Sequence, residues 1–362
     1  MGGYRSSNGY VGFAIQAAQA TGINPSTFLR LAAEEAFEQV QDVVEVRSLN
    51  GDRELDAIYK TQHTPQGSFQ TYARPNLGAE LLAYALGADT VVSGTGDTYV
   101  HTITKANTIP YLTFERKLDS VERFIGSKIN QIVISGTSGQ PITIDVSFLA
   151  SDASIQSASA TATYETDEPF MFYDGTYTLD SGAITTISAF TITINNNLET
   201  IFTTSYKPNN FMEGAFDIEV AMTLKFEASE TMYAAVLYGA GTALTDALDT
   251  GNFTVNLDYG TGATERKLQF AIPNLTHRSI TKHLDPNTKA VYLNMISKPT
   301  KSASEIITVT AINTTGGDYI SPSASSSPSS SASPSSSLSP SPSPSGSPSP
   351  SVSPSSSVSP SS

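Results

Sequence analysis

The chain has 362 residues, and its 34 acidic residues outnumber its 20 Lys and Arg, giving a formal net charge of −14 at pH 7. This acidity argues against a protein that wraps nucleic acid, since affinity for phosphate comes from Lys and Arg. The absence of cysteine excludes disulfides, thiol nucleophiles and cysteine-based zinc sites. No apolar run approaches the ~20 residues that span a bilayer, and residues 1–21 lack a continuous apolar core, so we expect no secretory signal peptide.

Strict alternation of apolar and polar residues recurs along the chain and predicts half-buried β-strands. The longest such segment is 216–226, where one face is apolar and the other carries acidic, Thr and Lys side chains. The same pattern is found in segments 142–148, 190–194, 253–259 and 268–272. We therefore expect a mainly β fold whose sheets turn one face to a core and the other to water.

Two short helices are expected between these strands. The first covers about residues 78–86, after Pro75, and Gly87 is placed to cap its end. The second covers about residues 230–238 and is followed by Gly239. Each helix comes after an alternating strand and precedes a turn-rich stretch and more strands.

This order of elements indicates an internal repeat with an offset of about 150 residues. The segment between the two halves, residues 161–182, is rich in turn-forming and acidic residues. The expected organisation is an N-terminal arm at 1–24, a first unit at 25–160, a second unit at 165–312 and a tail at 321–362.

The tail consists almost entirely of Ser and Pro and contains no charged residue. Such a composition cannot bury enough surface to offset the entropy of ordering the chain. We expect residues 321–362 to be disordered, with extended polyproline-II character where Ser and Pro alternate. A solvated tail without a defined role and a solvating or glycan-bearing stalk are both compatible with this composition.

No pattern in the sequence indicates an active site. The four histidines, His63, His101, His277 and His283, lack metal-ligand spacing on a helix. There is no G-x-S-x-G motif and no complete phosphate-binding glycine motif. Acid pairs such as Glu34-Glu35 and Asp167-Glu168 are ordinarily solvated, although a glycosidase would use two carboxylates. We predict no catalytic, cofactor-binding or metal-binding residue, no cofactor, and no enzyme activity.

Several segments resemble, in order, the motifs of the major tail tube proteins of long, non-contractile-tailed (siphovirus-like) bacteriophages. They are Gly78-Ala-Glu-Leu-Leu-Ala-Tyr-Ala-Leu-Gly87, Tyr99-Val-His-Thr-Ile103, Phe124-Ile-Gly-Ser-Lys-Ile-Asn-Gln-Ile132, Ala189-Phe-Thr-Ile-Thr-Ile-Asn-Asn-Asn-Leu-Glu199, and Leu268 to Pro273. Each motif alone is weakly specific, but their order extends over residues 25–311. Residues 28–40 show helical spacing, whereas the family is extended there.

The resemblance implies tandem β-sandwich or half-barrel tail-tube units, each with one short helix. It implies a structural virion protein whose rings stack into the phage tail tube, the conduit for genome ejection. The partners it implies are other copies of the chain, the tail terminator, the tail tip and the tape measure. DNA would pass without specific binding, no membrane would be involved, and assembly would take place in the host cytoplasm.

Two units per chain make a homotrimeric ring with pseudo-sixfold symmetry the expected assembly, with a homohexamer as the alternative. A lumen for DNA should repel phosphate, and we expect acidic side chains from polar strand faces to line it. The candidates are Asp145, Asp217, Glu219 and Asp258. The competing hypothesis is an extracellular β-rich adhesin or carbohydrate-binding module carried on a Ser/Pro stalk.

Overall fold

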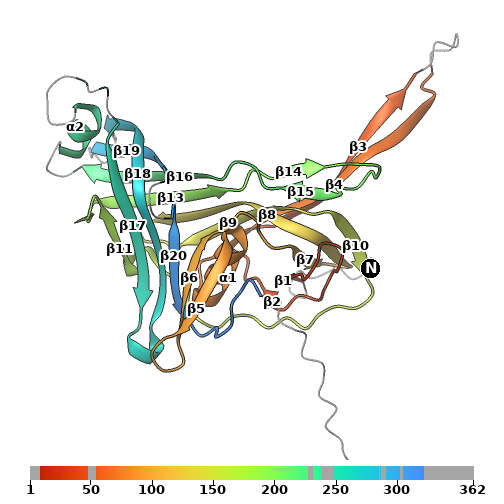
Figure 1. Ribbon diagram of the computed structural model, residues 1–362, viewed down its shortest axis with the longest axis horizontal. Coiled ribbons are helices and arrows are strands. Elements are labelled where there is room, and N and C mark those ends of the chain that lie inside the picture. Colours follow the sequence, from red (N-terminus) through yellow and green to blue (C-terminus); the bar gives the residue numbers. More distant parts are fainter. Residues whose placement is uncertain are drawn as a thin grey trace, which may run out of the picture. The chain divides into compact units, whose positions relative to one another are not determined.

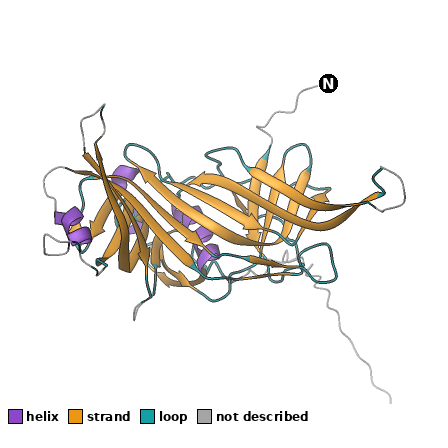
Figure 2. Ribbon diagram, turned by 90° about the horizontal axis from the view of Figure 1, so that it is seen from above, coloured by secondary structure: helices purple, strands orange, loops and turns teal. Residues whose placement is uncertain are grey.

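The computed structural model describes residues 9–47, 54–226, 231–238, 244, 246, 248–284, 286, 291–301 and 305–321. Figures 1 and 2 show that strands make up most of this part of the chain, as predicted. Most of the predicted Ser/Pro tail lies outside the described residues. Among the residues described, no helix is long and apolar enough to cross a membrane.

The first half of the chain contains a long helix and ten strands. They are β1 (Tyr10–Ile15), β2 (Thr27–Phe28), β3 (Ala36–Val46), β4 (Ala57–Tyr72), α1 (Pro75–Leu86), β5 (Gly87–Ser93), β6 (Tyr99–Lys105), β7 (Leu112–Lys117), β8 (Val121–Thr137), β9 (Thr143–Leu149) and β10 (Asp152–Gln156). β1 lies inside the segment expected to be an N-terminal arm. It is buried and pairs along its whole length with β7.

The second half contains ten strands and a shorter helix. Its elements are β11 (Gly175–Leu179), β12 (Gly182–Ala183), β13 (Ile187–Asn195), β14 (Glu199–Ile201), β15 (Asn210–Met212), β16 (Asp217–Phe226), α2 (Thr231–Tyr238), β17 (Thr250–Tyr259), β18 (Arg266–Leu284), β19 (Val291–Pro299) and β20 (Thr308–Asn313). Three-residue 3-10 turns at Phe172–Asp174 and Gly262–Thr264 connect some of them. All five segments predicted from alternation lie largely within strands.

Both predicted helices are present, and the helical spacing of residues 28–40 does not produce a third. Those residues run from the end of β2 into β3. Phe37 explains this outcome: its ring packs edge-on against Phe124, at 5.3 Å between centroids, and against Phe148, at 5.0 Å. Packing in the core and pairing with β4 outweigh a local helical preference.

The helix α1 is buried on all sides. It contacts β5, β6, β8, β18 and β20, and ten of its twelve residues are buried. Pro75 occupies the first turn, where its missing N–H costs nothing. Gly87 ends the helix in the left-handed conformation, with φ of 94°. A helix that is apolar over most of its surface is stable only inside a core, which is where it lies.

The strand pairings of the two halves follow one scheme. In the first half β1 pairs with β7, β3 with β4, β4 with β9, and β8 with β7, β9 and β10. In the second half β11 pairs with β17, β13 with β16, β16 with β19, and β18 with β17, β19 and β20. All of these pairings are antiparallel. The helix follows β4 in the first series and β16 in the second.

Candidate functional site: an eight-stranded sheet with one polar face

Four strands from each half form one continuous antiparallel sheet. The pairings place them in the order β3, β4, β9, β8, β13, β16, β19, β18. The two halves meet where β8 pairs with β13, from Gln131 opposite Asn195 to Thr137 opposite Ala189. β3 lies at one end of this series of strands, and residues 277–284 of β18 lie at the other, while the first part of β18 pairs with β17 and β20.

One face of the sheet is apolar and packs on the core. It carries, among others, Phe69, Ile132, Ile134, Ile144, Val146, Phe148, Phe190, Ile192, Ile194, Val220, Met222, Leu293 and Met295, each at most 3% exposed. At about 25 cal/mol per Å² of apolar area, burial of these side chains is the main force that holds the sheet on the core, which includes α1. The orientation of the sheet is therefore set by the core.

The opposite face is polar because strand side chains alternate. Its residues include Gln66, Ser68, Gln70, Gln131, Ser135, Thr143, Asp145, Ser147, Thr191, Thr193, Asn195, Asp217, Glu219, Thr223, Asn294 and Lys298, all partly or fully exposed. Hydrogen bonds tie neighbouring strands together across this face. Gln70 donates to Asp145 at 2.9 Å, and Thr223 donates to Asn294 at 3.1 Å.

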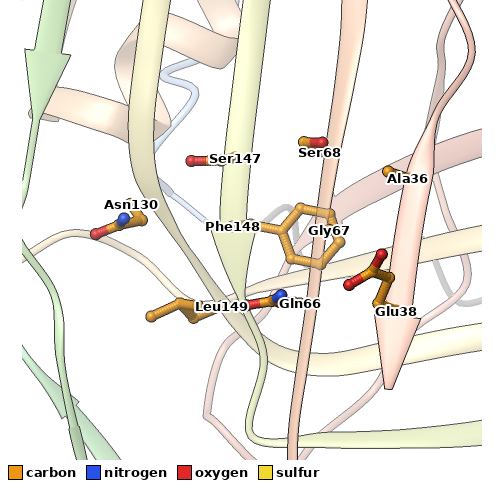
Figure 3. Close-up of a pocket in the computed structure, with 9 residues that line it drawn as sticks. All are labelled: Ala36, Glu38, Gln66, Gly67, Ser68, Asn130, Ser147, Phe148 and Leu149. Carbon is orange, nitrogen blue, oxygen red and sulfur yellow. The ribbon is translucent and has the colours of Figure 1, made fainter. Parts of the chain in front are cut away.

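A depression of about 300 Å³ lies on this polar face between β3, β4, β9 and β8. Figure 3 shows its lining residues, which include Glu38, Gln66, Ser68, Asn130 and Ser147. Glu38 is the only titratable side chain among them. A single carboxylate among amides and hydroxyls can hold water but does not make a general acid–base pair.

Three of the four acidic residues proposed for a lumen lie on this face. They are Asp145 on β9 and Asp217 and Glu219 on β16, whereas Asp258 lies on β17, which is not one of these eight strands. Lys298 donates to Asp217, and Arg278 lies 3.9 Å from Glu219. Partial burial raises the pKa of Asp145, against the opposing effect of its bond from Gln70. The face is therefore strongly hydrophilic but carries mixed charge.

The two outer strands differ in charge. Within its range β3 contains Glu38, Asp42 and Glu45 and no Lys or Arg. The end of β18, residues 277–284, contains Arg278, Lys282 and two His and no acid. Among the described residues, β3 pairs only with β4, and residues 277–284 pair only with β19. One edge of the sheet is acidic and the other is basic.

The hairpin of β3 and β4 extends past the rest of the sheet. β9 pairs with β4 only from Gln66 to Tyr72, so among the strands that the structure describes residues 57–65 pair with β3 alone. This arm, which Figure 1 shows projecting from the body, exposes several large apolar side chains. Val43 is 52% exposed, Ile58 58% and Tyr59 60%. Exposed apolar residues gathered on one element are typical of a contact with another protein.

Two of the buried histidines, His101 and His277, have structural partners. Nδ1 of His101 lies 2.8 Å from Asp89, and its Nε2 lies 2.8 Å from the carbonyl oxygen of Thr315. The ring of Tyr319 stacks on His101 at 4.5 Å between centroids. Burial lowers the pKa of His101, but the bonds to Asp89 and Thr315 raise it more, so the net shift is upward. The contacts of His101 with Thr315 and Tyr319 thus hold the segment that follows β20 against β6.

His277 is also buried, and its Nδ1 lies 2.8 Å from Oγ of Ser297 on the neighbouring strand. Within the part of the chain that the structure describes, no three His, Asp or Glu side chains gather as metal ligands. The residues with acid–base or ligand chemistry thus stabilise the fold or lie singly on the polar face.

The sequence was compared with known proteins and with models of protein families. No curated protein matches the sequence. A family model described as "Phage tail tube protein" matches residues 6–327, which is most of the chain. The chain therefore belongs to the phage tail tube protein family and is a structural component of the virion.

Proposed function

We propose that the protein forms closed rings that stack into the tail tube and that the phage genome passes through the bore. The observation that carries this proposal is the eight-stranded sheet with one polar face and two outer strands of opposite charge. A sheet of this kind can continue from one copy to the next and close into a barrel, which removes its exposed edges. The polar face then lines a water-filled lumen.

The polar face is suited to a passage that must not hold DNA. Ser, Thr, Asn and Gln predominate on it, and the basic Lys298 is engaged by Asp217. Affinity for phosphate depends on available Lys and Arg, so such a surface binds DNA weakly and without sequence preference. No catalytic step and no cofactor is needed for this role.

We propose that the two halves are tandem tail-tube units, close to the expected ranges of 25–160 and 165–312. The shared pairing scheme supports the duplication and extends the first unit to include β1. Three chains would then supply six units, which makes a homotrimeric ring the expected assembly. The other partners in this proposal are the tail terminator, the tail tip and the tape measure, with assembly in the host cytoplasm.

Negative-stain electron microscopy of the purified protein tests the function directly. We expect rings or tubes with a continuous central channel. A protein that stays monomeric at high concentration and low salt would contradict the proposal. Native mass spectrometry of isolated rings tests the stoichiometry separately: three chains are expected, and six chains would exclude the trimer while leaving the tube role intact.

A further inference from the structure

We propose that β3 of one chain pairs, antiparallel and in a defined register, with residues 279–283 of β18 in the next chain. This inference rests on the proposed ring and identifies the contact that would close it. The chain contains its own template for the contact, because β8 of the first half pairs with β13 of the second. In the shared pairing scheme β18 is the counterpart of β8, and β3 is the counterpart of β13.

Irregularities in the ladders align β8 with β18 residue by residue. The β8–β9 ladder has a register shift after Ile129, and the β18–β19 ladder has one after His277. Placing Ile129 on His277 aligns the two strands. In this alignment Ser127 corresponds to Leu275, and each of these residues follows a second register shift, in the β7–β8 ladder and in the β17–β18 ladder respectively. Two bulges at matching positions fix the alignment, since a bulge is a specific structural feature.

The alignment of β3 with β13 follows from their inner neighbours. Phe37 pairs with Gly67 on β4, and Ile192 pairs with Val220 on β16. Gly67 pairs with Phe148 on β9, and Val220 pairs with Ser297 on β19. Phe148 and Ser297 are equivalent because they pair with Ile129 and His277, so Gly67 and Val220 are equivalent too. Phe37 and Ile192 are both buried and face the core, as equivalent positions must.

Transferring the β8–β13 register to the outer strands gives the contact between chains. It places Ala36 opposite His283, Phe37 opposite Lys282, Glu38 opposite Thr281, Gln39 opposite Ile280, and Val40 opposite Ser279. Phe37 faces the core, and a slip by one residue would place it opposite a β18 residue that faces the polar side, so this register is strongly specified.

Charge supports the same pairing. In this register the acidic Glu38 and Asp42 lie on the polar side of β3 and would approach the basic Arg278, whereas Lys282, opposite Phe37, lies on the core side. Two β3 edges brought together would repel each other, as would two β18 edges. Opposite charges across strands stabilise a pair and like charges disfavour it. The edges therefore favour a head-to-tail contact, which closes into a ring when the rotation allows it.

The template also shows which opposed residues lie closest. The amide of Asn196 donates to Asn130, and the amide of Ser138 donates to Ser188, so these are hydrogen-bonded pairs of the β8–β13 ladder. Pairs alternate along an antiparallel ladder, which makes Val133 opposite Thr193 a non-hydrogen-bonded pair. Its counterpart between chains is Glu38 opposite Thr281, at a spacing of about 4.5 Å between Cα atoms that suits a disulfide.

Disulfide trapping in the full-length protein tests the register, because the natural chain has no cysteine. The test variant is Glu38→Cys with Thr281→Cys, and Ala36→Cys with His283→Cys is a second variant in case the first fails to fold. We expect mild oxidation of assembled protein to give covalent multimers of the chain that dithiothreitol reverses. Glu38→Cys with His283→Cys, which is out of register, should give markedly less.

The intrachain pair Val133→Cys with Thr193→Cys is the matched control. It should oxidise to a similar extent without forming multimers. The edge pairing would be overturned, and the tube role would stand, if tubes form normally but neither in-register pair crosslinks. The same conclusion would follow if the out-of-register pair crosslinks better than the in-register pairs. Wild-type protein that forms no ring or tube would overturn both.

Discussion

Gly126 shows how a single residue positions a strand of the polar sheet. It lies in β8 at the irregularity of the β7–β8 ladder and has φ of 62°, in the left-handed region. Its amide donates to the side chain of Gln16 at 3.0 Å. A Cβ at this position would stand 2.2 Å from Oγ of Ser151. The site therefore requires glycine for two reasons, backbone conformation and close packing.

We expect Gly126→Ala to destabilise the fold by more than about 2 kcal/mol. Gly139→Ala is the control, because Gly139 also has positive φ, 79°, but no atom lies within 4 Å of its Cβ position. Only the conformational cost, about 1 kcal/mol, applies there. Denaturant unfolding of both variants measures the difference. Equal losses would show that close packing at Gly126 contributes nothing.

Glu80 links the stability of the helix α1 to pH. Burial raises its pKa to about 7, although hydroxyl groups of Tyr84 and Thr27 donate to the carboxylate. Because the folded-state pKa exceeds the unfolded value, the folded state binds more protons between pH 4.5 and 7. The contribution of Glu80 is thus most favourable below the unfolded pKa and is lost as pH rises through the folded one.

We expect Glu80→Gln to flatten the pH dependence of unfolding in that window, by on the order of 3 kcal/mol at most. Chemical denaturation between pH 4.5 and 8 measures it. Relative to wild type, the variant should gain stability as pH rises. If the free energies of unfolding of wild type and variant changed in parallel with pH, Glu80 would not be the group responsible.

At the scale of elements, the N-terminus of α1 is capped from a distant segment. The carboxylate of Glu165 accepts the backbone N–H of Asn76 at 2.9 Å and of Leu77 at 3.0 Å. These donors have no partner within the helix, and a carboxylate there also complements the helix dipole. Glu165 lies between the two halves of the chain, so the connecting segment helps to hold the first-half helix in place.

We expect Glu165→Ala to lower the free energy of unfolding by about 1–2 kcal/mol. Glu168→Ala is the matched control, since Glu168 is exposed and accepts a hydrogen bond from the hydroxyl of Tyr259 through its backbone carbonyl, which the substitution keeps. Thermal unfolding of the two variants distinguishes them. Similar melting temperatures for both variants would show that the cap does not stabilise the fold.

At the scale of the whole molecule, the charges of the two outer strands should control assembly. We expect Glu38→Lys with Asp42→Lys to abolish rings, because two basic edges would then face each other. Adding Arg278→Glu to the same chain should restore part of the assembly. Sedimentation velocity at low and high salt measures the effect, and wild-type assembly should weaken as salt rises. Ring formation by the uncompensated variant would rule out this electrostatic role.

The sequence by itself determined the mainly β class, the position of α1, the buried face of the five alternating segments and the family. These depend on local periodicity and on residues such as Pro75 and Gly87, which act within a few positions of the chain. The helical spacing at residues 28–40 misled because local pattern competes there with the aromatic contacts of Phe37.

Only the tertiary structure decided which strands share a sheet. The pairing of β8 with β13, the place of β1 beside β7, and the cap from Glu165 to α1 join residues far apart in sequence. No local signal specifies such partners, because any strand with the right alternation can pair with any other. Long-range packing selects among them, and in this chain it brings three of the four proposed acidic residues to one polar face and leaves Asp258 on β17, which is not one of the eight strands.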